Sequence, residues 1–112
     1  MINICPVQNS LKLIGGKWKI SILYNLRTYP LRFGELRRLH SPITQQMLTK
    51  QLREMESDNL IARKVFEVIP PKVEYSLTDF GRSLLPIFDL LCQWSTEHEE
   101  FIEAIIEDKF IS

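Results

Sequence analysis

Apolar side chains recur with a helical period through residues 43–58, whose sequence is ITQQMLTKQLREMESD. At a period of about 3.6 residues per turn they gather in one arc, and they are Met47, Leu48, Leu52 and Met55. The opposite arc carries amides, a hydroxyl and charged groups, namely Gln45, Gln46, Thr49, Lys50, Arg53 and Glu56. Such amide, hydroxyl and cationic side chains hydrogen-bond base edges and phosphates in the DNA major groove. The pattern predicts a recognition helix at 44–57; the alternative is an amphipathic helix whose polar face meets only solvent.

Both ends of this helix are marked in the sequence. Thr44 is the expected N-cap, because its hydroxyl can accept a hydrogen bond from a free N–H of the first turn. Pro42 disfavours a helical conformation at Ser41, so the helix is not expected to extend backwards. Asn59 follows the acidic end of the helix and tolerates the left-handed conformation that closes many helices.

Three shorter helices are predicted before it, over residues 6–14, 17–29 and 32–39, with Leu31 a candidate for a short strand. Trp18 is expected to anchor the second helix in the core. The third helix is expected to turn three side chains inward, which are Phe33, Leu36 and Leu39. Two helices separated by a short turn, here at residues 40–42, form a helix-turn-helix arrangement.

Two strands are predicted next, at residues 60–66 and 73–77, and the second alternates apolar and polar side chains. Pro70 and Pro71 cannot donate hydrogen bonds to a neighbouring strand, so they belong in the connecting loop. A hairpin directly after a recognition helix is a wing, and its tip is predicted at residues 66–73. Three of its cations are candidates for phosphate contacts beside the groove, namely Arg63, Lys64 and Lys72.

A helix capped by Thr78 is predicted to follow, with a kink at Pro86, because proline disrupts a helix interior. Cys92 is expected to be buried as a small apolar side chain. The last segment carries more apolar surface than a domain of this size readily covers, at Phe101, Ile102, Ile105 and Ile106. A helical dimer interface explains this surface; the alternative is a tail folded back onto its own core.

The net charge of the 112 residues is zero, but the two ends of the chain differ. Residues 1–82 contain 13 Lys and Arg against 7 Asp and Glu, which gives +6. Residues 83–112 contain one Lys against 7 Asp and Glu, which gives a net charge of −6. A basic body with an acidic tail is typical of a nucleic-acid binder that keeps a separate, non-binding face. The alternative is that folding mixes both halves into a neutral surface.

Several classes of function are disfavoured. No apolar run approaches the roughly 18 residues of a membrane span, and no signal peptide is recognisable, so a cytoplasmic protein is expected. His40 and His98 lack ligand-like spacing to any cysteine or carboxylate. Gly15 and Gly16 end a helix and do not match a phosphate-binding loop. No catalytic residue, metal site or cofactor is therefore predicted.

Cations outside the recognition helix are further candidates for phosphate contacts. Lys17 and Lys19 begin the second helix, where positive charge opposes the helix dipole, and two solvated lysines are the equal alternative. Cys5 precedes the helix at 6–14, where the dipole favours a reactive thiolate. The alternative for Cys5 is a half-buried small residue. The outer side of the helix at 32–39 carries Arg32, Arg37 and Arg38.

Taken together, these segments resemble the HxlR-type winged-helix regulators, relatives of the MarR-type group. The resemblance covers roughly residues 5–94 and rests on motifs that occur in the family's order. They are CPV (5–7), GGKW (15–18), LRFGELRR (31–38), QMLTKQLREME (46–56) and PPKVEYSLTDFGRSLLP (70–86), with Trp94 after them. Two departures are Asn59, where a glycine is usual, and Pro42-Ile43-Thr44, where Gly-Ile-Ser is common.

The resemblance implies a bacterial or archaeal homodimeric transcription factor whose helix at 44–57 enters the major groove. It implies that the tip at 66–73 lies over the minor groove or the backbone. A cysteine at the position of Cys5 senses electrophiles or oxidants in some members; only this cysteine matches here, so modification or a disulfide between subunits is implied. Dimerisation is expected through N- and C-terminal helices, with interface candidates Val7, Leu11, Phe88, Leu91, Trp94, Phe101 and Ile105.

The prediction is an α+β, mostly helical winged helix-turn-helix in one domain, 1–112, with a core at 17–82 and dimerisation segments at 1–16 and 83–112. It is expected to read an inverted-repeat operator in double-stranded DNA as a homodimer, with a small-molecule or oxidant effector still to be identified. Base contacts are predicted for Gln45, Gln46 and Thr49. Phosphate or groove contacts are predicted for Lys50, Arg53, Arg32, Arg37, Arg38 and Lys72. The alternative function is a winged-helix protein-interaction module without specific DNA binding.

Overall fold

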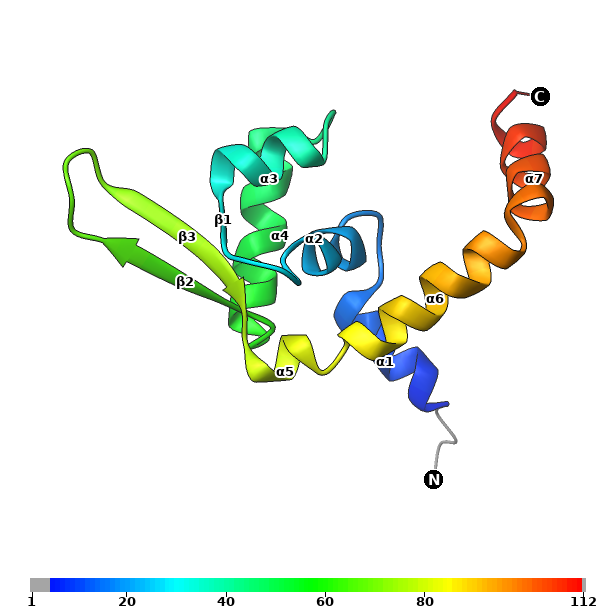
Figure 1. The fold of residues 1–112 in the computed structure, drawn as a ribbon, viewed down its shortest axis with the longest axis horizontal. Coiled ribbons are helices and arrows are strands. Elements are labelled where there is room, and N and C mark those ends of the chain that lie inside the picture. Colours follow the sequence, from blue (N-terminus) through cyan, green and yellow to red (C-terminus); the bar gives the residue numbers. More distant parts are fainter. Residues whose placement is uncertain (1–4, 112) are drawn as a thin grey trace.

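The structure of the chain, a computed structural model, describes residues 5–111, and side chains up to residue 109. Residues 1–4 and 112 of the expected dimerisation segments lie outside the described part. Along the chain the elements are α1 (Pro6–Ile14), α2 (Lys19–Asn25), β1 (Leu31–Arg32), α3 (Phe33–Leu39), α4 (Gln45–Ser57), β2 (Ile61–Phe66), β3 (Lys72–Leu77), α5 (Asp79–Arg82), α6 (Leu85–Glu97) and α7 (Glu99–Ile111). The strands form one antiparallel sheet in the order β1-β3-β2. This is a winged helix (Figure 1).

The core lies where α2, α3 and α4 meet the base of the sheet. It consists of aliphatic side chains with little or no exposed surface, among them Ile22, Leu23, Leu26, Leu36, Leu48, Leu52, Met55, Leu60 and Ile61. Trp18 is half-buried against this cluster, as expected for an anchor of the second helix. Burial of apolar surface is the dominant stabilising contribution to such a fold.

Both predicted ends of α4 are confirmed. The hydroxyl of Thr44 accepts a hydrogen bond from the backbone N–H of Met47 at 3.1 Å. Asn59 has a φ of 60°, in the left-handed region. The N–H of Leu60 donates to the carbonyl of Met55 at 2.9 Å, and the N–H of Asn59 donates to that of Glu56 at 3.0 Å. These two bonds form a Schellman motif, which satisfies carbonyls at the helix end.

The predicted wing is the hairpin of β2 and β3, joined by residues 67–71. Arg63 pairs with Tyr75 and Val65 pairs with Val73 across the hairpin. The short strand anticipated at Leu31 is β1, which pairs with β3 and brings the chain before α3 onto the sheet. The wing extends from the body beside α4 (Figure 1).

The kink predicted at Pro86 is wrong, because the segment is two helices. Thr78 caps α5 as expected, accepting from the N–H of Gly81 at 2.9 Å. α5 ends at Arg82, and Pro86 lies in the first turn of α6. A proline there removes no helical hydrogen bond, since the first N–H groups of a helix have no partner within it.

Two inward-facing positions were also predicted wrongly. Leu39 and Met47 are 58% and 37% exposed, although the helical period favoured burial of both. The buried side chain at the turn is His40, which is 4% exposed. Its Nδ1 lies 2.7 Å from the Leu36 carbonyl and its Nε2 lies 3.0 Å from Nδ2 of Asn25. These bonds give both ring nitrogens a partner in the core, and they tie the turn of the helix-turn-helix to α2.

α6 and α7 project away from the rest of the chain (Figure 1). The radius of gyration is 16.3 Å, whereas about 13 Å is expected for a compact chain of this length. α7 follows α6 after a bend and lies away from the core (Figure 1), so the alternative of a tail folded back onto the core does not hold. None of the helices in residues 5–111 has the length and apolar character needed to cross a membrane.

We expect His40→Ala to lower the free energy of unfolding by about 1–3 kcal/mol, because it leaves a buried amide and carbonyl with one partner fewer. Urea denaturation followed by circular dichroism measures the change. Leu39→Ala is the matched control, because Leu39 is the exposed neighbour of His40. Its truncation should lower the free energy of unfolding by no more than about 0.5 kcal/mol. Equal effects of the two substitutions would show that the bonds of His40 contribute nothing.

Candidate nucleic-acid interface

The exposed face of α4 forms a shallow hollow that carries most of the predicted recognition residues. Its lining consists of Thr44, Gln45, Gln46, Thr49, Lys50, Arg53 and Glu54. The opposite face of the helix is buried, with Leu48, Leu52 and Met55 at most 2% exposed. Because side chains three and four residues apart lie on the same side of a helix, Gln45, Thr49 and Arg53 follow one another along the exposed face.

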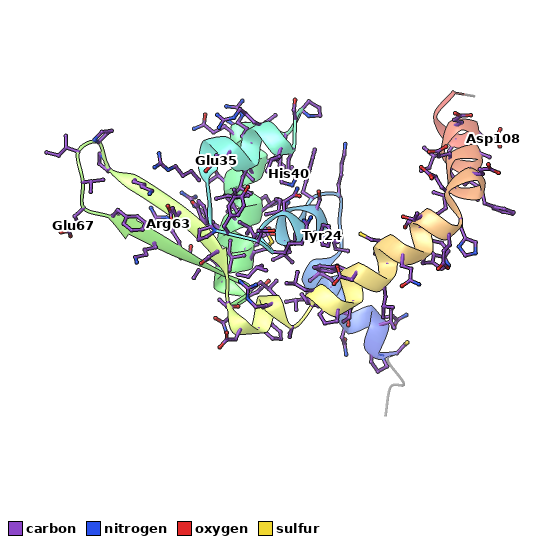
Figure 2. The ribbon with its side chains drawn as sticks, viewed as in Figure 1. Tyr24, Glu35, His40, Arg63, Glu67 and Asp108 are labelled. Atoms are coloured by element: carbon purple, nitrogen blue, oxygen red, sulfur yellow. The ribbon has the colours of Figure 1, made fainter. Side chains whose placement is uncertain are left out.

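A second hollow lies between α4 and the sheet. It is lined by Phe33, Gln45, Thr49, Leu52, Arg53, Glu56, Arg63 and Tyr75. Gln45, Thr49 and Arg53 therefore border both hollows. Arg63 comes from β2 of the wing (Figure 2), and its sequence position predicts only a phosphate contact beside the groove. The pairing of Arg63 with Tyr75 in the sheet turns it toward α4, which local sequence patterns do not reveal.

The hydroxyl of Thr49 has a hydrogen-bonding role within the helix. It donates to the carbonyl of Gln45 at 2.8 Å. The oxygen of a hydroxyl keeps its lone pairs when its proton is donated. The Thr49 hydroxyl oxygen can therefore still accept a hydrogen bond.

Lys19 does not lie free at the start of α2, as its phosphate-binding prediction required. Its Nζ lies 2.8 Å from Oε2 of Glu54 on α4, and the lysine side chain is only 12% exposed. The hydrogen bond from Lys19 holds the pKa of the Glu54 carboxyl below its ordinary value, and the positive charges of Lys19 and Lys50 act in the same direction. The ion pair joins α2 to the recognition helix and neutralises an acid beside Arg53.

Four further predicted cations lie before α2 and on β1 and α3. Lys17 precedes α2, is exposed, and places its Nζ 4.9 Å from the ring centre of Trp18. The backbone N–H of Arg32 donates to the Glu35 carboxylate at 3.0 Å, which fixes the first turn of α3. Arg37 and Arg38 are exposed in the last turn of α3. Cations at that end are also favoured by the helix dipole, so their position has a structural explanation as well.

The wing holds two lysines over one aromatic ring. The Nζ atoms of Lys64 and Lys72 each lie 4.8 Å from the ring centre of Phe66. Lys72 also lies 2.8 Å from Oε1 of Glu74. Contacts of this kind restrict long side chains, so the two ammonium groups are held near the outer half of the hairpin.

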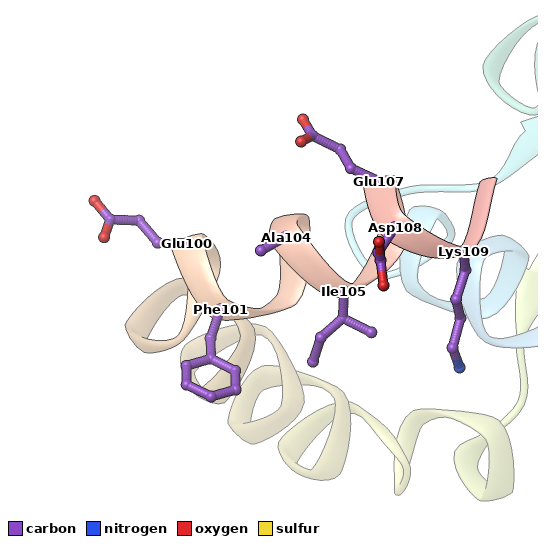
Figure 3. Close-up of a pocket in the computed structure, with 7 residues that line it drawn as sticks. All are labelled: Glu100, Phe101, Ala104, Ile105, Glu107, Asp108 and Lys109. Carbon is purple, nitrogen blue, oxygen red and sulfur yellow. The ribbon is translucent and has the colours of Figure 1, made fainter. Parts of the chain in front are cut away.

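Six of the seven interface candidates from the sequence are exposed in the protomer. Their exposed fractions run from 45% for Ile105 to 74% for Phe101, and the others are Val7, Leu11, Leu91 and Trp94. The exception is Phe88, which is 2% exposed and packs into the core of its own protomer, so it is not available to a partner. In Figure 3, Phe101 and Ile105 point to one side of α7, and Glu100 and Glu107 point away from them.

The two cysteines both lie on the surface. Cys5 is the N-cap residue of α1, as predicted. Cys92 was expected to be buried, and this is wrong because its side chain is exposed, although it lies beside α2. Its thiol forms a hydrogen bond with Tyr24 of α2, which is the main reason that the pKa of the tyrosine hydroxyl is raised. Within residues 5–111, no group of three or more His, Cys, Asp or Glu side chains is arranged to hold a metal ion.

Comparison with known proteins gives consistent matches over most of the chain. A model of the family described as HxlR-like helix-turn-helix matches residues 13–103. The uncharacterized HTH-type transcriptional regulator YdeP of Bacillus subtilis (strain 168) is 48% identical over 101 residues, which are 90% of this chain and 79% of YdeP.

Solved structures of similar sequence share the fold. The reduced form of the redox regulator HypR superposes with a TM-score of 0.85 at 46% identity, over 89% of this chain and 99% of that one. The oxidized form of HypR superposes with a TM-score of 0.79 at 49% identity, over 83% of this chain and 96% of that one. The reduced form of the transcriptional regulator YodB from B. subtilis superposes with a TM-score of 0.73 at 32% identity, over 82% of this chain and 91% of that one. A structure of diamide-treated YodB superposes with a TM-score of 0.70 at 31% identity, over 86% of this chain and 96% of that one.

The Lys19–Glu54 pair makes stability depend on pH. Because the pKa of Glu54 in the folded protein is below its ordinary 4.5, the ionised carboxylate stabilises the fold above that value, and the contribution is lost as the pH falls through the lowered pKa. We therefore expect Glu54→Gln to melt below the wild type at pH 7, with the difference shrinking toward pH 3. Thermal denaturation across this range measures it.

Glu56→Gln is the matched control, because Glu56 lies on the same helix and forms no ion pair within the described residues. Its melting temperature should follow the wild type at every pH. A difference between Glu54→Gln and the wild type that stays constant with pH would rule out the ion pair as its source.

Proposed function

Because the chain belongs to the HxlR-like helix-turn-helix family and is a helix-turn-helix transcriptional regulator, we propose that it binds an inverted-repeat operator as a two-fold dimer. In this proposal α4 lies in the major groove and the wing formed by β2 and β3 lies alongside it. The proposal concerns how the protein reads DNA, how two copies assemble, and how an oxidant releases them.

The observation that carries the proposal is the row of Gln45, Thr49 and Arg53 shared by the two hollows beside α4. An amide, a hydroxyl and a guanidinium are suited to hydrogen-bonding base edges, and a helix of this width fits the major groove. Gln46 extends the polar face at the N-terminal end, where recognition helices approach the bases. Arg63 adds a cation on the wing side of the same surface.

Cations around this face supply contacts to the DNA backbone. Lys50 is exposed on α4, and Arg32, Arg37 and Arg38 are exposed on the neighbouring α3 and β1. Lys72 is held on the wing. Contacts to phosphates fix the position of a protein on the duplex and make its affinity depend on salt. Lys17 is exposed and remains a candidate, whereas Lys19 acts indirectly by holding Glu54.

The second copy is proposed to cover the exposed apolar side chains of α1, α6 and α7. These are Val7, Leu11, Leu91, Trp94, Phe101 and Ile105. Large exposed apolar patches on a protein surface are typical of interfaces. A two-fold axis through these helices sets two copies of α4 about one DNA turn apart, roughly 34 Å, so the operator is an inverted repeat.

An oxidant-responsive thiol is the second part of the proposal. Cys5 is exposed at the N-cap of α1, on an element assigned to the dimer interface. HypR is described as a redox regulator with oxidized and reduced forms, and YodB has been studied after treatment with the thiol oxidant diamide. Modification of Cys5, or a disulfide between subunits, would change the interface and with it the spacing of the two recognition helices.

The test of DNA reading is selection of binding sites from random DNA, followed by gel shifts over a salt series. We expect tight, salt-sensitive binding of a dimer to one inverted repeat. Arg53→Ala should weaken binding to this site by about 1–3 kcal/mol with a changed base preference if Arg53 contacts a base, and should mainly lower the salt slope if it contacts a phosphate.

Lys12→Ala is the control, because it also removes one positive charge but lies on α1, away from α4. It should leave both the affinity for DNA and the salt slope near the wild-type values. Arg53→Ala binding that equals the wild type at every salt concentration would remove Arg53 from the interface. Weak wild-type binding that is equal on all sequences would favour the alternative of a protein partner for the winged helix.

The test of the thiol uses the selected operator with and without diamide. We expect diamide to release the wild type, dithiothreitol to restore binding, and Cys5→Ser to stay bound throughout. Cys92→Ser is the matched control because Cys92 is the other exposed thiol. Release of Cys5→Ser by diamide would exclude Cys5 as the sensor, and retention of both variants would indicate a disulfide between Cys5 and Cys92 of different subunits.

A further inference from the structure

The tip of the wing is apolar and fully open to solvent. Ile69 shows 101% of its reference surface, and its neighbour Val68 shows 52%. Two prolines follow, Pro70 and Pro71, before β3 begins at Lys72. A single exposed apolar side chain is common on proteins. An aliphatic tip of three or four consecutive residues on a projecting hairpin is different, because every side chain there stays hydrated in the free protein.

The tip is also short of polar groups that would bind phosphate. Proline has no backbone N–H, so neither Pro70 nor Pro71 can donate a hydrogen bond. The N–H of Val68 is already used, donating to the carbonyl of Phe66 at 2.9 Å. The prolines and this turn restrict the backbone, so the tip presents Ile69 on a stiff support.

Cations stand directly behind this apolar tip. Lys64 and Lys72 both lie over the ring of Phe66, three residues before Ile69. Residues 63–72 contain three cations and one acid, Glu67, so the outer wing carries a net charge of +2. Glu67 is seen toward the outer part of the wing in Figure 2. An apolar point flanked by positive charge complements a groove whose rims are phosphates and whose walls are sugars.

We propose that Ile69, supported by Val68 and Pro70, enters the DNA minor groove beside the operator half-site and packs against sugars and base edges as an apolar wedge. The inference rests on the proposed function, because it takes DNA as the partner of the wing. The minor groove offers a degenerate hydrogen-bonding pattern, so a contact there needs no polar side chain. Proteins that insert apolar side chains into it widen or kink the duplex at the step they touch.

This contact gives the regulator a way to select sequence without hydrogen bonds. Pyrimidine–purine steps such as TA deform easily, whereas A-tracts are stiff and have a narrow minor groove. The wedge therefore favours binding to operators that have a flexible base-pair step, such as TA, where the wing tip meets the DNA. Because Ile69 is uncharged, its contribution to affinity is independent of salt, unlike that of Lys72, which releases counterions from the DNA when it binds.

The experiment compares Ile69→Ala with the wild type on the operator selected above. We expect about tenfold weaker binding with an unchanged salt slope, since loss of a buried aliphatic side chain corresponds to about that factor. Ile69→Met keeps an apolar side chain of similar size and should restore binding. Val65→Ala is the matched control, because Val65 is 50% exposed on the stem of the same wing and should bind like the wild type.

Hydroxyl-radical footprinting locates the contact, because the radical cleaves sugars from the minor groove. Wild-type protein should protect the sugars beside each half-site, and Ile69→Ala should lose that protection while keeping its protection over the half-site itself. Replacing the flexible step there by an A-tract should weaken the wild type and leave Ile69→Ala unaffected.

Three results overturn the wedge and leave the proposed function standing. The first is wild-type affinity of Ile69→Ala on the operator, and the second is a footprint unchanged by the substitution. Loss of affinity in Val65→Ala equal to that in Ile69→Ala would likewise overturn it, because the effect would then come from the wing as a whole. Absence of sequence-specific binding by the wild type would instead refute the proposed function, and the wedge with it.

Discussion

Burial of one side of α4 is the constraint on which the rest of the structure depends. Leu48, Leu52 and Met55 are at most 2% exposed, and each contributes roughly 1.5–3 kcal/mol to folding through the apolar surface it removes from water. A rotation of the helix by one residue would expose all three. The same packing therefore fixes Gln45 and Arg53 on the outer face, so core stability and the orientation of the proposed DNA-binding face have one cause.

Polar contacts at the edges of α4 complete its placement. His40 joins the turn before the helix to α2, and Lys19 joins its last turns to the start of α2. At the far end, Gly81 of α5 lies so close to the carbonyl of Leu60 that a Cβ there would meet its oxygen at 2.0 Å. The helix is therefore held from three directions, which suits a surface that must match DNA without rearranging.

The chain separates three surfaces that differ in chemistry. The face of α4 and α3 is polar and basic, while α1, α6 and α7 expose apolar side chains, with acids on α6 and α7. The wing combines cations in its outer half with an apolar tip at Ile69. α7, which carries most of the acids after residue 82, lies away from α3 and α4 (Figure 1), so the charge asymmetry of the sequence survives folding.

Local features of the sequence determined the elements and their ends: the helical period, the cap at Thr44, the closing Asn59 and the prolines of the wing. These depend on interactions within a few residues, which a sequence displays directly. Tertiary structure decided which side chain at the turn is buried, His40, and that Phe88 belongs to the core of its own protomer. It also brought Arg63 beside α4. Such outcomes depend on partners distant in sequence, because burial and charge pairing are set by whatever the fold places opposite each side chain.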